Sequence, residues 1–276
     1  MPKKKKKKIP QAETADRHLC YEQSVQCAEA EIDFVTTTFK QLRKRDVREL
    51  REDFCGTATV CCDFVARHED NHAYGVDLDT DVLHWGREHR VNALTSEQAL
   101  RVSLIEDNVL TAKTPKVDAL LAMNFSYWLF KEREDLVNYF KIARESLKDD
   151  GIMFLDAFGG YESFQELEEE REIDDDDAGF TYVWDQASFN PINNNMICHI
   201  SFHFNDGSVM KNAFTYDWRM YTLPEIRDIL KDAGFKKSTI YWEGWDEDEE
   251  EGNGIYEPAE QGEADPGWVV YITAEK

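Results

Sequence analysis

The stretch LREDFCGTATV, residues 50–60, decides the fold of this 276-residue chain. A β-prone segment, 47–53, ends in two acidic residues, and Gly56 follows shortly before a helical pattern begins near Thr57. Such a turn from a strand into a helix places backbone N–H groups beside the ligand crevice of an open α/β sheet. A dinucleotide loop requires the glycines of GxGxxG, and Phe54 occupies the first of these positions. The stretch therefore predicts an α/β fold whose ligand loop is poorly suited to a pyrophosphate.

The residues on both sides of this loop alternate between short apolar runs and helical patterns. An amphipathic helix is predicted over 28–45, and further helices near 57–67, 81–92 and 133–147. Four more strands are predicted from AYGVD (73–77), RVSLI (101–105), VDALLAMN (117–124) and GIMFLDAF (151–158). Together with 47–53 they indicate a mostly parallel sheet covered on both faces, and right-handed crossovers make it doubly wound.

The second half of the chain has a different pattern. The acidic segment 164–179 predicts a helix that runs into a solvated loop, and 180–189, 196–204 and 208–218 predict three antiparallel strands. The stretch 223–235 predicts a helix with Pro224 near its start and Gly234 just after its end. Two last strands, 238–245 and 267–274, flank an acidic loop at 246–266. The predicted fold is a doubly wound, mostly parallel seven-stranded sheet with an antiparallel C-terminal hairpin and a small antiparallel β insertion after the fifth strand.

The charge of the chain is strongly acidic, with a net charge of −24 at pH 7. Lys3 to Lys8 oppose this balance, and without them the remainder carries −30. We expect residues 1–12 to form a disordered lysine-rich tail and 13–276 to form one domain, with 161–222 as an insertion at its rim. A functional tail, as a nuclear-import signal or an arm for nucleic acid, and a solvated segment without function are equally compatible with this run. The body itself is too acidic to track a phosphate backbone.

The chain contains neither an apolar run long enough to span a membrane nor the apolar core of a secretory signal. We therefore expect a cytoplasmic protein, possible nuclear entry being left to the lysine tail. The six cysteines form no CxxC pair and no metal-ligand spacing, so we expect reduced thiols and no metal site.

The order of strand, acidic residue and FCGTA resembles the first motif of class I S-adenosylmethionine-dependent methyltransferases, an acidic residue followed by x-G-C-G-T-G. Glu52 takes the acidic position, Phe54 the first glycine and Ala58 the last, where a helical conformation is expected to suffice. A methionine tail has an ammonium and a carboxylate but no phosphate, so one glycine can admit it while Glu52 orders the loop or receives the ammonium. The cofactor residues that the resemblance implies here are Glu52, Phe54, Cys55, Gly56 and Thr57.

Two further segments carry the resemblance toward the adenosine part of the cofactor. Asp77 ends the second strand, where the family's acidic residue binds both ribose hydroxyls, and Leu78 follows it. Asp79 is the competing carboxylate. After the third strand the family commonly places an acceptor for the adenine amino group, and Asp107 and Asn108 both occupy this region. A helix cap and a polar turn are the structural alternatives for these residues.

The segment after the fourth strand lies where the family presents the methyl group to its acceptor. Residues 124–127, NFSY, resemble the N-P-P-Y box of amino-group methyltransferases, with both prolines replaced. A fixed amide carbonyl and an aromatic face can orient a lone pair and stabilise a sulfonium. The candidate catalytic residues are Asn124, Tyr127 and Asp156, and Asn124 and Phe125 are also candidate cofactor contacts. Packing of an apolar strand end is the alternative.

The insertion lies where related small-molecule methyltransferases build a rim over the active site. Its aromatic and polar residues suggest a pocket for a flat or cationic group, although aromatic strand surfaces are more often core. The candidate substrate residues are Tyr182, Trp184, His199 and Arg219. Near the N-terminus, Tyr21 could close over the cofactor by analogy with family lids.

The resemblance implies an S-adenosylmethionine-dependent methyltransferase acting on a small molecule or a protein side chain. A non-catalytic binding or scaffold protein of the same fold is the first alternative, because Phe54 and the missing prolines depart from the motifs. A nucleic-acid methyltransferase is the second and conflicts with the acidic body. A nicotinamide dehydrogenase ranks last, because the glycines are absent. The oligomeric state is not predicted by the sequence.

Overall fold

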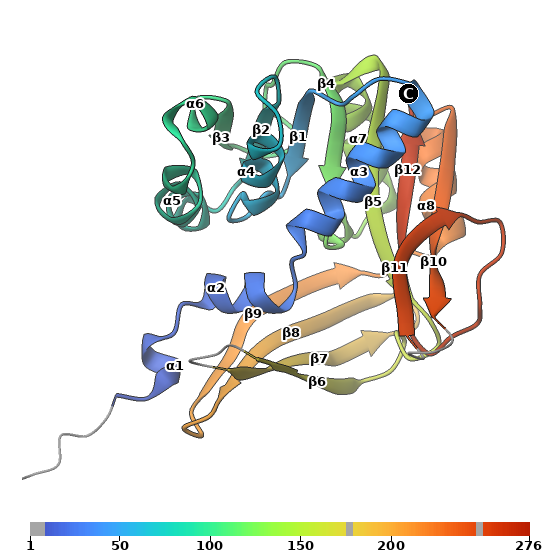
Figure 1. The fold of residues 1–276 in the computed structure, drawn as a ribbon. Coiled ribbons are helices and arrows are strands. Elements are labelled where there is room, and N and C mark those ends of the chain that lie inside the picture. The colour runs from blue at the N-terminus through green and yellow to red at the C-terminus, as the bar shows by residue number, and fades with distance from the viewer. Residues whose placement is uncertain (1–8, 175–178, 247–250) are drawn as a thin grey trace, which may run out of the picture. The chain divides into compact units, whose positions relative to one another are not determined.

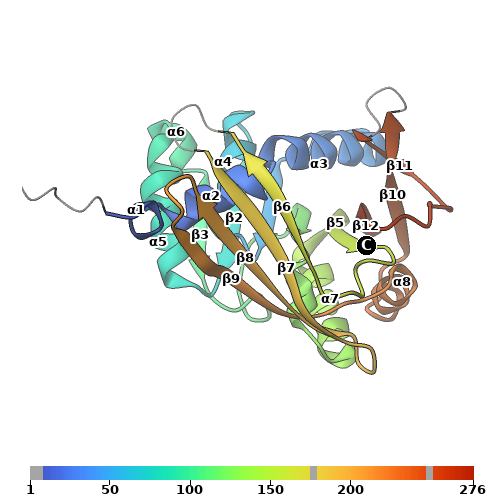
Figure 2. The same ribbon diagram turned by 90° about the horizontal axis from the view of Figure 1, so that it is seen from below.

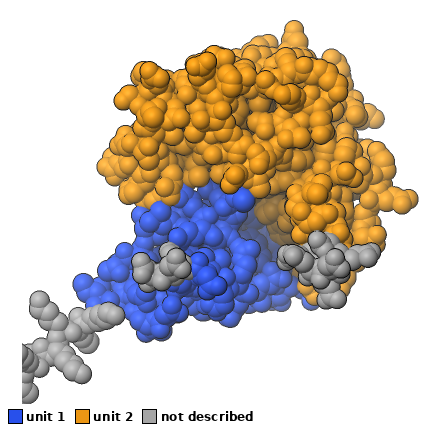
Figure 3. Space-filling model, in the orientation of Figure 1, with its two compact units in different colours: residues 1–27, 164–220 blue, residues 28–163, 221–276 orange. Residues whose placement is uncertain are grey.

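The structure is a computed structural model that describes residues 9–174, 179–246 and 251–276. It divides into two compact units, which Figure 3 distinguishes by colour. Unit 1 consists of residues 1–27 and 164–220, and unit 2 of residues 28–163 and 221–276. The second segment of unit 1 lies within residues 161–222, for which an insertion is predicted.

Unit 2 is built on an eight-stranded sheet in the order β11-β10-β12-β5-β4-β1-β2-β3 (Figure 1). The five neighbouring strands β5, β4, β1, β2 and β3 are parallel to one another. Strand β12 is antiparallel to both of its neighbours, β5 and β10. The strand bounds are β1 Glu49–Asp53, β2 His72–Asp77, β3 Val102–Glu106, β4 Val117–Ala122, β5 Leu147–Gly159, β10 Lys237–Asp246, β11 Glu251–Pro258 and β12 Trp268–Glu275. The order reverses between β1 and β4, so the ligand crevice expected of such sheets lies at the carboxyl ends of these two strands.

Helices cover both faces of this sheet, as Figures 1 and 2 show. The apolar side chains of α3, α4 and α5 share one core with β1, β4 and β5, and α7 and α8 lie on the opposite face. The bounds are α3 Ala28–Arg43, α4 Thr59–Ala66, α5 Thr80–His89, η1 Val91–Ala93, α6 Ser96–Ala99, η2 Ser126–Leu129, α7 Arg133–Ser146 and α8 Leu223–Asp232. The predicted doubly wound α/β fold is therefore confirmed.

Unit 1 is a four-stranded antiparallel sheet in the order β6-β7-β8-β9, together with two short helices. The bounds are α1 Gln11–Thr14, α2 Arg17–Ser24, β6 Leu167–Ile173, β7 Phe180–Asn190, β8 Asn195–Phe204 and β9 Val209–Arg219. Phe180, Ile200 and Phe202 form its buried core with Cys20 of α2. None of the helices in the described ranges is both long and apolar enough to cross a membrane.

Two acidic segments are strands where other structure was predicted. The predicted helix at 164–179 is wrong over 167–173, because β6 pairs with β7 along its whole length and Arg171 lies over the Tyr182 ring. The predicted loop at 246–266 contains β11, which pairs with β10. Consecutive glutamates favour helix locally, but pairing with a neighbouring strand outweighs that preference. The large sheet therefore has eight strands instead of seven, and the insertion has four instead of three.

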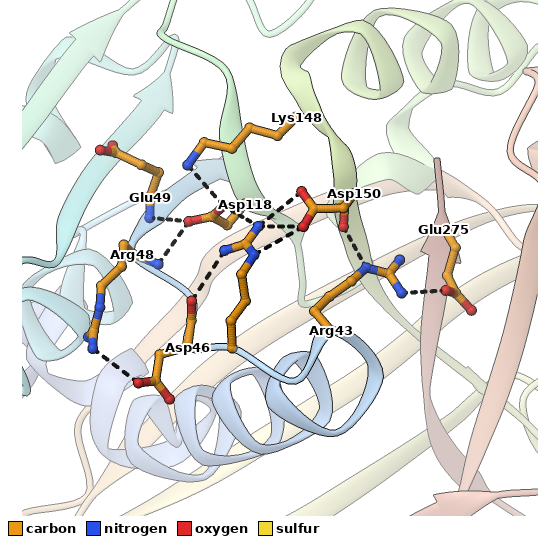
Figure 4. Close-up of polar contacts among 9 residues, drawn as sticks. Arg43, Asp46, Arg48, Glu49, Asp118, Lys148, Asp150 and Glu275 are labelled. Carbon is orange, nitrogen blue, oxygen red and sulfur yellow. Dashed lines mark hydrogen bonds and ion pairs between the residues drawn. The ribbon is translucent and has the colours of Figure 1, made fainter.

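A buried carboxylate, Asp118 of β4, ties the start of β1 to the neighbouring strands (Figure 4). Its Oδ2 accepts hydrogen bonds of 2.9 Å from the backbone N–H groups of Arg48 and Glu49. Its Oδ1 lies 2.8 Å from Arg45 Nη2 and 2.9 Å from Lys148 Nζ. Burial raises the pKa of this carboxyl, but the hydrogen bonds from Lys148 and Arg45 outweigh it, so the net pKa is below the ordinary value.

Asp118→Asn is expected to lower the free energy of unfolding by about 2 kcal/mol at pH 7, since an amide lacks the charge and accepts at only one atom. Because folding depresses the Asp118 pKa, its ionic stabilisation is present above the unfolded-state pKa and is lost as pH falls through the folded-state pKa. Urea unfolding at pH 7 and pH 3 should therefore show a deficit that narrows in acid. A deficit that is equal at both pH values would contradict the ionic role.

Candidate functional site

The loop after β1 adopts three left-handed residues in alternation. The φ angles are 61° at Phe54, 52° at Gly56 and 61° at Ala58. These are the three positions that the family's motif gives to glycine, and the helical conformation expected for Ala58 is wrong, because it caps α4 in the left-handed region. Non-glycine residues remain in this region only where surrounding packing holds them. Phe54 contacts Tyr139 with ring centroids 5.7 Å apart, and Ala58 is fully buried. The chain therefore keeps the path of a glycine loop with only one of its three glycines, Gly56.

Hydrogen bonds from the loop to β2 fix its position. The Cys55 N–H donates to Val76 O at 3.1 Å, and the Gly56 N–H donates to Asp77 Oδ2 at 2.9 Å. The Cys55 side chain packs against Gly75, where an added Cβ would lie 2.8 Å from Sγ. Burial raises the pKa of the Cys55 thiol well above its usual range, which is typical of an unreactive packing cysteine.

Gly56 leaves open space at the centre of this loop. An added Cβ at Gly56 would meet no atom within 4 Å, whereas one at Gly86 of α5 would lie 2.5 Å from the Thr57 carbonyl oxygen. The loop is thus closely packed on its α5 side and open at Gly56. A ligand that approaches the backbone here would find room and the N-terminal end of α4.

The carboxylates after β2 have separate tasks. Asp79 caps α5, because its side chain accepts hydrogen bonds from the N–H groups of Asp81 and Val82. Of the two carboxylates, Asp79 is therefore the one that serves as the helix cap. Asp77 accepts from Gly56 and, at 2.9 Å, from the Asp79 N–H. Each of its oxygens keeps a second lone pair that could accept from a hydroxyl. Leu78 is 66% exposed beside it and offers an apolar surface for a ring.

Asp107 and Asn108 both stabilise the turn after β3. Asp107 Oδ1 accepts from the Asn108 N–H at 2.7 Å and from the Thr111 hydroxyl at 2.8 Å, and Asn108 Oδ1 accepts from the Leu110 N–H at 2.9 Å. The polar-turn alternative therefore accounts for these contacts.

The turn after β4 closes on a carboxylate of β5. Asn124 and Phe125 are left-handed, with φ of 55° and 56°, and their N–H groups donate to the two oxygens of Asp156 at 2.7 and 2.9 Å. Burial raises the pKa of Asp156 to about 7, although both backbone hydrogen bonds favour its charged form. The Tyr127 hydroxyl is fully buried and donates to the Asp156 carbonyl at 2.7 Å. The sequence-predicted residues Asn124, Phe125, Tyr127 and Asp156 thus meet at the carboxyl ends of β4 and β5.

Alternate residues of β1 face opposite layers of unit 2. Arg51 and Asp53 form a fully buried ion pair at 2.6 Å, and Tyr139 of α7 donates its hydroxyl to Asp53 at 3.0 Å. Glu52 points to the other face, where its Oε2 lies 3.1 Å from Cys61 Sγ of α4. Burial raises the pKa of Glu52 to about 8. The acidic residue of the motif therefore occupies an apolar environment beside α4.

A buried glutamate on α3, Glu31, was not predicted from the sequence. Its exposure is 6%, and the charges of Glu52 and Asp156 add to the burial that raises its pKa. The residue lies four positions before Val35 on the apolar stripe of α3. A charged residue within an apolar stripe is a signal that could have been recognised.

The four predicted substrate residues of unit 1 do not share one face of its sheet. Trp184 pairs with Ile200 and, like Tyr182, belongs to the core face, whereas His199 pairs with Thr215 and Arg219 lies four residues further along β9 on that opposite face. Side chains of directly paired residues project to the same side of a sheet. Tyr21 of α2 packs against Phe214 with ring centroids 4.9 Å apart. The aromatic residues are therefore largely part of the unit 1 core.

The chain resembles known proteins in its structure and not in its sequence. No protein-family model matches the sequence, and no curated protein matches it. Among solved structures, DesVI of Streptomyces venezuelae has a TM-score of 0.68 at 16% identity over 97% of this chain and 98% of its own. CalS10, an amino pentose methyltransferase from Micromonospora echinaspora described as bound to S-adenosylmethionine, has a TM-score of 0.67 at 16% identity over 94% and 96%. A methyltransferase from Clostridium acetobutylicum has the same values.

These similarities extend over nearly the whole of both chains, including the residues of unit 1. At this level of identity they establish architecture. No group of three or more His, Cys, Asp or Glu in the part of the chain that the structure describes could hold a metal ion. With its strand order and its turn after β1, the chain has the fold of the class I S-adenosylmethionine-dependent methyltransferases.

Proposed function

We propose that this protein transfers a methyl group from S-adenosylmethionine to an amino group of a small molecule. The observation that carries the proposal is the loop of left-handed Phe54, Gly56 and Ala58, joined to the Asp77 carboxylate at the switch point of the sheet. The structural neighbours include proteins described as an amino pentose methyltransferase and a sugar N-methyltransferase, which supports an amine acceptor. The net charge of −24 also suits a cationic substrate.

The residues around the crevice fit the parts of this cofactor. Open space at Gly56 would admit the methionine tail, and Asp77 would accept from the ribose hydroxyls. Exposed Leu78 would lie against the adenine ring, with Asp107 or Asn108 accepting from its amino group. Glu52 would face the positively charged amino end. When bound, S-adenosylmethionine supplies an electrophilic methyl group on a sulfonium.

The contribution of the protein to such a reaction is alignment and the exclusion of water. Asp156 holds the backbone of Asn124 and Phe125 in left-handed conformations, and Tyr127 fixes Asp156 through its carbonyl. We therefore assign Asp156 and Tyr127 as positioning residues and Asn124 as the residue that would orient the acceptor. Tyr182, Trp184, His199, Arg219 and Tyr21 remain predictions for the acceptor side.

The first test is calorimetric titration with S-adenosylhomocysteine, the demethylated product, followed by assay of a labelled methyl donor against amino sugars. Micromolar binding and label transfer to an amine are expected. Absence of binding by the folded wild-type protein would refute the proposed cofactor. Binding with transfer only to a hydroxyl or a protein would refute the proposed acceptor alone.

Asp77→Ala is expected to weaken S-adenosylhomocysteine binding by about 1.5–3 kcal/mol, since hydrogen bonds to a charged acceptor would be lost. The same titration measures the effect. Asp81→Ala is the matched control, because it removes a nearby exposed carboxylate from the first turn of α5. Equal affinities for wild type and Asp77→Ala would show that Asp77 is not the ribose acceptor.

A non-catalytic binding protein of the same fold is the second candidate. Two aromatic residues, Phe54 and Phe125, occupy left-handed turns at the crevice, and the Phe54 ring contacts Tyr139. Cofactor binding without methyl transfer to any acceptor in a cell extract is the result expected from such a protein. Labelled product from the wild type would exclude it.

A further inference from the structure

Glu31, in the first turn of α3, has a buried carboxyl oxygen without a hydrogen-bond partner among the described residues. Its side chain is 6% exposed, and Oε2 accepts no hydrogen bond from any of the described residues. Such an atom loses its hydration without gaining a partner, which costs free energy in the folded protein. Ile32 and Val35, which lie close to Glu31 on α3, are fully buried. An apolar residue at position 31 would therefore make the folded protein more stable than glutamate does.

Two other buried carboxyls belong to elements at or next to the contacts of α3. Helix α3 packs against α4, which Glu52 of β1 contacts through Cys61, and against β5, which carries Asp156. After burial, the charges of Glu52 and then Asp156 are what raise the Glu31 pKa. None of the ion pairs within the described ranges involves any of the three carboxyls. Among the described residues, the cluster therefore lacks a cation.

The geometry favours an ammonium over a metal ion. The carboxyl oxygens of the described residues do not converge closely enough to form a metal-ligating group. One oxygen of Glu52 accepts from Cys61, and both oxygens of Asp156 accept from backbone N–H groups. Glu31 Oε2 is a buried acceptor of the cluster that no described residue engages. An ammonium carries three donors that can reach separate acceptors at hydrogen-bond distance.

We propose that Glu31, Glu52 and Asp156 form a binding site for an alkyl ammonium group, and that Glu31 is the cofactor-binding residue that accepts from the α-ammonium of S-adenosylmethionine. The inference rests on the proposed function. It assigns this role to a residue of α3 that lies outside every motif of the sequence. Glu52 and Asp156 stand at the carboxyl ends of β1 and β5, beside the crevice in which the methionine tail would lie.

Proton release is one consequence of this site. Burial raises the pKa values of Glu52 and Asp156 to about 8 and about 7 and that of Glu31 well above its usual range. The other titratable groups that interact electrostatically with Glu52 or Asp156 include Cys55, Cys61, Asp77 and Tyr256, and Asp53 does so from the opposite face of β1. An ammonium favours the charged carboxylates, so its binding at pH 7 should release on the order of one proton. Titration in two buffers of different ionisation enthalpy measures this number.

The experiment compares two ligands and two variants. S-adenosylhomocysteine has the α-ammonium, whereas 5′-methylthioadenosine has the same nucleoside without it. Glu31→Gln is expected to weaken S-adenosylhomocysteine at least about tenfold and to reduce proton release, while 5′-methylthioadenosine binding stays unchanged. Glu29→Gln makes the same substitution at an exposed position of the same helical turn and should change neither ligand.

Each outcome decides a different point. Unchanged S-adenosylhomocysteine affinity in Glu31→Gln, with wild-type binding intact, would overturn the role of Glu31 and leave the proposed function standing. Equal weakening of both ligands would overturn it as well, since damage to the fold would then be the cause. A folded wild type that binds neither ligand would refute the proposed function and this inference with it.

Discussion

Arg51→Met is expected to lower the free energy of unfolding by about 3–5 kcal/mol, the cost of leaving one member of a buried ion pair without the other. The side chains of Arg51 and Asp53 are fully buried, and Arg51 Nε lies 2.6 Å from Asp53 Oδ1. The guanidinium also donates to the Val109 carbonyl at 3.1 Å and to the Ser146 hydroxyl at 3.3 Å, which ties β1 to the segment after β3 and to α7. Equilibrium unfolding in urea, followed by circular dichroism, measures the loss.

The double variant Arg51→Met/Asp53→Asn separates the lost charge pairing from lost packing. Burial already raises the pKa of Asp53 beside Arg51, so without the guanidinium this carboxyl is an uncompensated buried group. The amide that replaces the Asp53 carboxylate in the double variant carries no charge and can still accept from Tyr139 at one atom. The double variant should therefore recover about half of the loss. A single variant that loses less than about 1 kcal/mol would show that the pair contributes little.

The architecture of unit 2 could be predicted because it depends on alternating local patterns. Apolar strands such as Val117–Ala122, followed by amphipathic helices such as Arg133–Ser146, are recognisable in one sequence. Strand β6 was not predicted, since LEEEREI contains consecutive charged residues and its structure comes from pairing with β7. Local preference cannot reveal a partner strand that lies elsewhere in the chain.

The candidate site was predictable to the extent that polar residues follow strand ends. Gly56 and Asp77 could be selected as candidate residues in this way, and in the structure the Gly56 nitrogen lies 2.9 Å from Asp77 Oδ2. The left-handed conformations of Phe54 and Ala58 could not, because their side chains disfavour that region and only surrounding packing holds them there. The sequence also did not reveal that the four candidate substrate residues of unit 1 lie on two faces of its sheet. The register of β7 and β8 decides which face each side chain occupies, and local sequence does not determine that register.

Gly56→Val is expected to reduce the affinity for S-adenosylhomocysteine at least about 100-fold, or about 2.7 kcal/mol. Gly56 has a φ of 52°, which a β-branched residue tolerates poorly, so the variant should displace the N–H that donates to Asp77. Its side chain would also enter the open space in which an added Cβ meets no protein atom. Both effects act where the methionine tail is proposed to lie, and calorimetric titration measures their sum.

Gly207→Val separates occupation of the ligand space from backbone strain. Gly207, in the turn between β8 and β9, also has a positive φ, 80°, and open space at its Cβ position. Both variants should therefore lose similar stability in a thermal unfolding experiment, because both force a β-branched residue into the left-handed region. Only Gly56→Val should lose ligand affinity, since only Gly56 borders the proposed cofactor. If both variants lose affinity to the same extent, strain alone explains the result, and the open space at Gly56 is not the site of the methionine tail.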